Sequence, residues 1–392
     1  MKAGLVFLCA AYVLSQFFRA FLAVLTQALE RDIAAGPEDL AFASGLWFLT
    51  FAAMQIPVGW ALDRIGPRRV AAVLLAIGGG GGALMFAMAQ GPGQIGLAMA
   101  LIGVGCAPVL MASYYIFARE YPPAMFATLG AVMIGVGTLG NLAGSVPLAM
   151  AVDLVGWRAT LGGLAGVSVA LAAGVWLTVQ DPPKLEGNLS GSVLELLRRP
   201  ELWLIFPLMF VSYAPAAGLR GLWIGPYLSD VFGADAAAIG RATLVMGVAM
   251  VAGTLIYGPL DRVFRTRKWV IFTGNVIVAL ICFALVLWPD NGVISAVALC
   301  AAVGFFGMCF PLIMAHGRSF IPPHLTGRGV TLMNLFGIGG VGLFQVVTGQ
   351  LHTAVAAQGG AVERPYQVVF GFFAAVLVAG LLPYVFCRDR LD

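Results

Sequence analysis

The chain is built from apolar runs long enough to cross a lipid bilayer. A membrane-spanning helix needs about 20 consecutive apolar residues. Hydrophobic residues make up 60% of the chain and charged residues only 10%, against about 25% charged residues in soluble domains. The sequence therefore predicts an all-α membrane protein embedded in the lipid bilayer. We predict twelve transmembrane helices, at residues 4–29, 40–62, 70–90, 95–118, 125–151, 158–180, 202–229, 237–260, 269–288, 293–317, 327–351 and 367–387.

The longest polar connection divides these spans into two sets of six. Residues 181–200 contain two adjacent prolines and several charged side chains, which is typical of a linker between domains. We therefore predict an N-terminal six-helix half at 1–180, a cytoplasmic linker at 181–200 and a C-terminal six-helix half at 201–392.

Several motifs of the first half return in the second half. Cys106-Ala-Pro108 in the fourth span returns as Cys309-Phe-Pro311 in the tenth span. Glycines recur in spans five and eleven, and a run of five glycines lies in span three; all of these predict close packing of helices. They are Gly135, Gly137, Gly140, Gly337, Gly339, Gly342 and Gly78 to Gly82. Together the repeats predict two pseudo-symmetric halves.

The basic residues predict the orientation in the membrane. Most of the 22 Lys and Arg residues fall in the tails and in alternate turns. Because cytoplasmic loops are enriched in Lys and Arg, we expect both termini to be cytoplasmic, in the inner membrane of a bacterial cell. The basic residues are confined to short turns beside apolar spans, so no nucleic-acid partner is indicated.

The turn after the second span carries a distinctive motif. Residues 59–69 read GWALDRIGPRR, and Leu260-Asp261-Arg262 repeats its core in the second half. This motif resembles the signature loop between helices two and three of the major facilitator superfamily. The family pattern has Leu where Ala61 stands, and Pro67 replaces a basic residue.

The resemblance implies two six-helix halves that transport a solute by alternating access. It also implies a gating role for charged residues of the two motif copies, namely Asp63, Arg64, Arg68, Asp261 and Arg262. A simpler interpretation is that these charges only fix the orientation of the protein.

Two arginines lie inside the predicted spans. Arg19 is near the middle of span one, and Arg220 is slightly past the middle of the equivalent span seven. A charge at membrane depth costs several kcal/mol unless it faces a cavity or a partner. No Asp or Glu lies in the middle of any span, so we expect the two guanidiniums to converge on an anion, because their planar shape suits carboxylate or phosphate. The alternative is that they bond backbone carbonyls where a helix is broken.

Four nearby side chains are candidates for contacting the same substrate. Gln16 shares a helical face with Arg19, and Tyr12, Tyr213 and Trp223 lie close to the two arginines in the sequence. One basic residue in each of spans one and seven is similar to the arrangement of the organophosphate:phosphate antiporters. That resemblance implies transport of a small anionic organic solute, of carboxylate or phosphate type.

Other functions are less well supported by the residues. Met246 and Met250 lie on one helical face and resemble the paired methionines of facilitator-type copper importers, although methionine in apolar helices is usually core. A membrane sensor would bind without transport. No acid–base or nucleophile pair lies at depth, so we expect no enzymatic activity, no cofactor and no metal beyond that copper alternative. His316 is the titratable candidate for proton coupling. We expect a monomer.

Overall fold

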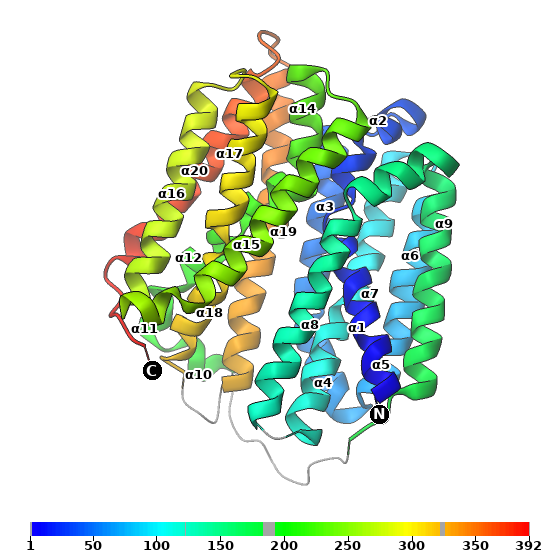
Figure 1. Ribbon diagram of the computed structural model, residues 1–392, viewed down its shortest axis with the longest axis vertical. Coiled ribbons are helices and arrows are strands. Elements are labelled where there is room, and N and C mark those ends of the chain that lie inside the picture. Colours follow the sequence, from blue (N-terminus) through cyan, green and yellow to red (C-terminus); the bar gives the residue numbers. More distant parts are fainter. Residues whose placement is uncertain (1, 122, 183–192, 322–325, 392) are drawn as a thin grey trace. The chain divides into compact units, whose positions relative to one another are not determined.

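The computed structural model describes residues 2–121, 123–182, 193–321 and 326–391 and is almost entirely helical. It forms two compact units, Met1–Gly187 and Asn188–Asp392. Residues 183–192 of the predicted linker lie outside the described part of the chain. Figure 1 colours the first unit from blue to green and the second from green to red.

Unit 1 begins with a bent pair of helices and ends with the long helix α9. Its elements are α1 (Lys2–Phe17), α2 (Leu22–Ile33), α3 (Pro37–Ala53), α4 (Gln55–Arg64), α5 (Pro67–Leu74), the π-helix η1 (Leu75–Gly81), α6 (Gly82–Ala87), α7 (Pro92–Glu120), α8 (Pro123–Ala143) and α9 (Val146–Thr178).

Unit 2 begins with a run of short helices and ends with α20. Its elements are α10 (Val193–Leu197), α11 (Pro200–Trp203), α12 (Phe206–Ser212), α13 (Ala214–Gly218), the π-helix η2 (Leu219–Trp223), α14 (Ile224–Phe232), α15 (Ala236–Phe264), α16 (Lys268–Leu287), α17 (Val293–Phe306), the 3₁₀-helix η3 (Gly307–Cys309), α18 (Phe310–Arg318), α19 (Thr326–Ala356) and α20 (Arg364–Tyr384).

The described residues contain 10 helices that are long and apolar enough to span a membrane, or 11 if the bent pair α1 and α2 is one span. The predicted span 125–151 overlaps α8 and the start of α9. The helix α9 contains a kink at Gly156, whose φ of 79° is a left-handed conformation that glycine adopts without strain. The predicted sixth span begins directly after that kink.

Glycine allows the same close helix contact in both units. A Cβ on Gly140 of α8 would lie 1.8 Å from the carbonyl oxygen of Val13 in α1. A Cβ on Gly340 of α19 would lie 1.8 Å from the carbonyl oxygen of Phe210 in α12. Only glycine fits at such distances, so close packing is confirmed at Gly140, but the matching contact in unit 2 uses Gly340. The prediction was wrong for Gly135 and Gly339, which have no atom within 4 Å of a built Cβ.

A second repeated feature is a carboxylate that caps the helix after each charged turn. In unit 1, Asp181 follows α9 and its Oδ1 accepts from the backbone N–H of Arg68 at 2.8 Å, in the first turn of α5. In unit 2, Asp389 follows α20 and its Oδ1 accepts from the backbone N–H groups of Arg267 at 3.1 Å and Lys268 at 2.9 Å, where α16 begins. The first N–H groups of a helix lack intrahelical partners, so these carboxylates satisfy them.

In unit 2 this cap also fastens the C-terminal segment to α16. The hydroxyl of Thr266 donates to Asp389 Oδ2 at 2.5 Å, and Lys268 Nζ donates to the carbonyl of Val385. Although partial burial opposes ionisation, the hydrogen bonds from Thr266 and from the two backbone N–H groups hold the pKa of Asp389 below its usual range. The helices α16 and α20 pack along each other in the same unit (Figure 1).

We expect Asp389→Ala to lower the apparent melting temperature of the full chain in detergent. Removing a helix-capping side chain costs about 0.5–2 kcal/mol. Because the pKa of Asp389 is depressed in the folded protein, its contribution is present above the ordinary aspartate pKa and is lost as the pH falls through the folded pKa. The gap between wild type and variant should therefore close in acid. Asp290→Ala, at an exposed carboxylate, is the matched control; an equal loss of stability in the control would contradict the cap.

Candidate functional site

Arg19 lies at a break in the first span. The sequence predicts a span over 4–29, and within that range α1 ends at Phe17 and α2 begins at Leu22, bent by 55°. Within the break the backbone N–H of Arg19 bonds the carbonyl of Gln16, and that of Ala20 bonds the carbonyl of Phe17. These bonds span three residues instead of four, and the chain changes direction while its buried backbone groups stay paired.

The guanidinium of Arg19 rests on two aromatic rings of α3. Its central carbon lies 5.2 Å from the Trp47 ring centroid and 4.9 Å from the Phe51 ring centroid. Trp47 and Phe51 are one helical turn apart and stack with centroids 5.1 Å apart. A cation over aromatic faces is stabilised by about 0.5–2 kcal/mol. The rings therefore support the charge without neutralising it.

The side chain of Arg19 makes no hydrogen bond or ion pair with another described residue. Its Nε is buried without a partner, while the side chain as a whole is half-buried. The Trp47 Nε1 is also buried without a partner. Unsatisfied buried donors cost free energy unless an acceptor reaches them. This corner of unit 1 is suited to an anionic acceptor.

Gln16 and Tyr12 form a hydrogen-bonded pair on α1. Gln16 Nε2 donates to the Tyr12 hydroxyl at 2.9 Å, and both side chains are buried. They lie against α8, where a Cβ on Gly137 would be 2.4 Å from the Tyr12 ring. The pair lies one turn before the break that holds Arg19.

Arg220 also lies at an irregular part of its span. It sits in η2, a π-helical segment between α13 and α14, and it is 3% exposed. Short π-helical segments often occur at functional sites. The first span of unit 1 and the equivalent span of unit 2 are thus both irregular where they carry their arginine.

The two aromatic candidates of unit 2 have different surroundings. Tyr213 is half-buried, with its ring centroid 5.2 Å from that of Phe310. Trp223 is fully buried; its Nε1 donates to Thr348 Oγ1 at 3.0 Å and its ring lies 5.1 Å from that of His352. Trp223 therefore belongs to the packed interior of unit 2 in this conformation.

The first charged turn is organised by Asp181. Gly66 has a φ of 108°, and a Cβ there would lie 2.7 Å from Asp181 Oδ1. Arg68 Nε is 3.6 Å from Asp181 Oδ2, and Arg64 is exposed beside the Trp60 ring. The side chain of Asp63 lies outside the described part of the structure.

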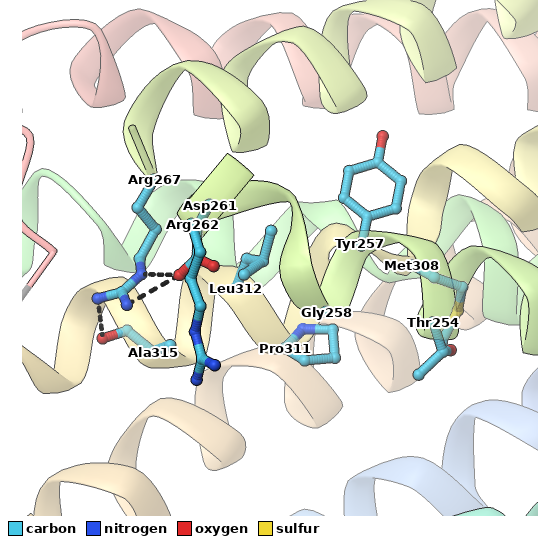
Figure 2. Close-up of a pocket in the computed structure, with 10 residues that line it drawn as sticks. All are labelled: Thr254, Tyr257, Gly258, Asp261, Arg262, Arg267, Met308, Pro311, Leu312 and Ala315. Atoms are coloured by element: carbon cyan, nitrogen blue, oxygen red, sulfur yellow. Dashed lines mark hydrogen bonds and ion pairs between the residues drawn. The ribbon is translucent and has the colours of Figure 1, made fainter. Parts of the chain in front are cut away.

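The second charged turn contains a well-shielded ion pair. Arg267 donates from Nε at 3.0 Å and from Nη2 at 2.9 Å to the same oxygen, Asp261 Oδ2. The two side chains are only 14% and 7% exposed. Arg262 is exposed, and its side chain makes no hydrogen bond or ion pair with a described residue. In Figure 2 its guanidinium points away from the Asp261–Arg267 pair.

This ion pair forms part of the wall of a cavity of about 280 Å³ within unit 2 (Figure 2). We refer to it as the Tyr257 pocket. It lies between α15 and the segment formed by η3 and α18, and is lined by Thr254, Tyr257, Gly258, Asp261, Arg262, Arg267, Met308, Pro311, Leu312 and Ala315.

The remaining candidates lie in packed environments. His316 is fully buried, with Nδ1 2.7 Å from the Tyr384 hydroxyl and Nε2 2.9 Å from the Arg388 carbonyl oxygen. Both ring nitrogens are therefore engaged within unit 2. Met246 and Met250 are buried and face Gly304 of α17, where a built Cβ would meet their Cγ atoms at about 3 Å. Across the described ranges, no three His, Cys, Asp or Glu side chains are grouped as metal ligands.

A family profile and several curated relatives indicate the same family for this chain. The sequence profile described as Major Facilitator Superfamily matches residues 8–345. NicT of Pseudomonas putida, described as a metabolite transport protein, is 21% identical over 389 residues, covering 90% of this chain and 87% of NicT. The 4-hydroxybenzoate transporter PcaK of Pseudomonas aeruginosa is 28% identical over 147 residues, covering 37% of this chain and 32% of PcaK.

A solved structure shows the same fold. The inward-facing, unoccupied bacterial homologue of the human lysosomal transporter Spinster has a TM-score of 0.77 at 17% identity, covering 98% of this chain and 95% of that one. The family fold expected from the motif at residues 59–69 is therefore supported by profile and structure alike. The chain is a multi-pass membrane transporter that belongs to the Major Facilitator Superfamily.

Proposed function

We propose that this transporter carries small organic anions across the inner membrane by alternating access, with Arg19 and Arg220 as its anion-binding groups. One observation carries the proposal above all others. The Arg19 guanidinium lies at a helix break, is supported by Trp47 and Phe51, and has no carboxylate partner in the described part of the chain. A guanidinium in this setting gains most from a ligand that supplies acceptors.

Two further facts favour an organic anion over an inorganic one. The surroundings of Arg19 are aromatic, so a ligand with an apolar body finds matching surface beside the charge. One relative that shares a 147-residue match is a transporter of 4-hydroxybenzoate, an aromatic carboxylate. Tyr12, Gln16 and Tyr213 lie near the two arginines in their own helices and are the proposed lateral contacts.

The charged turns are proposed as gates. Asp63, Arg64 and Arg68 form the first copy, and Asp261 and Arg262 form the second. The Asp181 and Asp261–Arg267 contacts favour this proposal, because they hold each turn in a defined position within its own unit. The proposed orientation has both termini in the cytoplasm.

We expect Arg19→Lys and Arg220→Lys each to weaken anion binding by roughly one to two orders of magnitude. A hydrogen bond to a charged group contributes about 1.5–3 kcal/mol, and lysine cannot reproduce the planar two-pronged contact. Binding is measured as thermal stabilisation of the purified protein by a panel of carboxylates and phosphate esters. Arg241→Lys, at an exposed position of α15, is the matched control. Near-normal binding by both folded variants would show that the arginines are structural.

We expect Asp63→Asn to lower the transport rate at saturating substrate while leaving binding affinity near that of wild type. The substitution removes one charge from the gate and none from the proposed anion site. Rates are measured in proteoliposomes that contain equal amounts of each protein. A loss of affinity at an unchanged maximal rate would exclude the gating role.

A reporter enzyme fused after Asp392 tests the orientation. We expect activity from a reporter that works only in the cytoplasm, because basic residues concentrate in the turns that share the side of the termini. Activity from a reporter that works only in the periplasm would reverse the topology.

A further inference from the structure

We propose that the Tyr257 pocket binds a small organic monoanion, with Arg262 contacting the anionic group and the apolar wall covering the body of the ligand. This is a second anion site, separate from Arg19 and contained within unit 2. It rests on the proposed function in one respect only, which is that the ligand belongs to the same chemical class as the transported solute.

The charge balance of the pocket favours a single negative charge. Asp261 and Arg267 form an ion pair with N–O distances of 2.9 and 3.0 Å, so each neutralises the other. Of the three charged residues in the lining, Arg262 is the one whose side chain has no ion-pair partner among the described residues. A ligand with one carboxylate would complete this balance.

The remaining wall favours a ligand with an apolar body. Tyr257 of α15 and Met308, Pro311 and Leu312 of η3 and α18 contribute ring and aliphatic surface (Figure 2). At about 280 Å³ the cavity is slightly below the range of about 300–1,000 Å³ that is usual for drug-sized ligands. It therefore suits a monocyclic or short-chain acid.

Hydrogen bonds from neighbouring helices hold the charged end of the pocket in place. The Arg267 side chain reaches across from the start of α16, and its Nη1 also donates to the carbonyl of Ala315 at 3.4 Å. The N–H groups at the start of α16 are in turn held by Asp389. The charged end of the pocket is thus fixed from α15, α16 and α18 together.

The test uses a cysteine introduced into the wall of the full-length protein. Thr254→Cys is close to isosteric and lies on α15, and Met308→Cys provides a second reporter on η3. Five of the six native cysteines are buried, and the chain without the new cysteine gives the background. Each reporter is labelled with an anionic and a cationic methanethiosulfonate of similar size, and the ratio of the two rates is measured.

We expect the anionic reagent to react faster than the cationic one. Arg262→Gln should lower the ratio of the anionic to the cationic rate roughly fivefold, as expected for one nearby charge in a partly hydrated site. Arg265→Gln, in the same turn but outside the lining, should change the ratio less than twofold. Benzoate, the probe ligand, should slow labelling in the wild-type background and lose this effect with Arg262→Gln. A ratio that does not respond to Arg262→Gln, or an absence of benzoate protection, would overturn the proposal.

Arg19→Lys separates this site from the proposed transport site. Both the rate ratio and the benzoate protection should survive that substitution, because Arg19 belongs to unit 1. If the pocket test fails while stabilisation by anions still depends on Arg19 and Arg220, only the second site is wrong. If protection disappears with Arg19→Lys, benzoate acts from the transport site and the pocket does not bind it.

Discussion

The strongest constraint on this protein is the free-energy cost of a guanidinium within an apolar span. Arg19 lies at a break between α1 and α2, where the aromatic faces of Trp47 and Phe51 stabilise its charge. Arg220 lies in the π-helical segment of the equivalent span. In each unit the helix departs from regular geometry at the arginine, so the irregular backbone and the charge occur together. Such departures are tolerated in membrane helices where the polar groups are buried in protein or line a cavity.

The two units share two further contacts, a carboxylate that caps a helix and a glycine at a close helix crossing. Asp181 and Asp389 each follow the last helix of their unit and cap the helix that begins after the charged turn. Gly140 and Gly340 each admit a carbonyl oxygen of the arginine-bearing span. In each unit, the glycine contact therefore fixes the span that carries the arginine, and the carboxylate fixes the charged turn.

The sequence indicates the candidate residues of this site but not their contacts. Arg19 and Arg220 stand out because a charge in an apolar run is unusual, and the motif at residues 59–69 indicates the family. No local signal gives the position of the break at Arg19, since residues 18–21 contain neither proline nor glycine. Trp47 and Phe51 support Arg19 from another helix, and no local pattern reveals that contact. Asp181 lies 113 residues from Arg68, and Asp389 lies 121 residues from Lys268. A carboxylate directly after the last span of each half is the one signal that could have indicated these caps.

The central claim is that the protein recognises the charge of its solute. The most direct measurement compares uptake into proteoliposomes of two labelled compounds: the carboxylate that most stabilises the purified protein, and its neutral amide of the same shape. We expect saturable uptake of the carboxylate, with no uptake of the amide and no competition by it. Equal uptake of the two, or equal competition by the amide, would contradict recognition through the arginines.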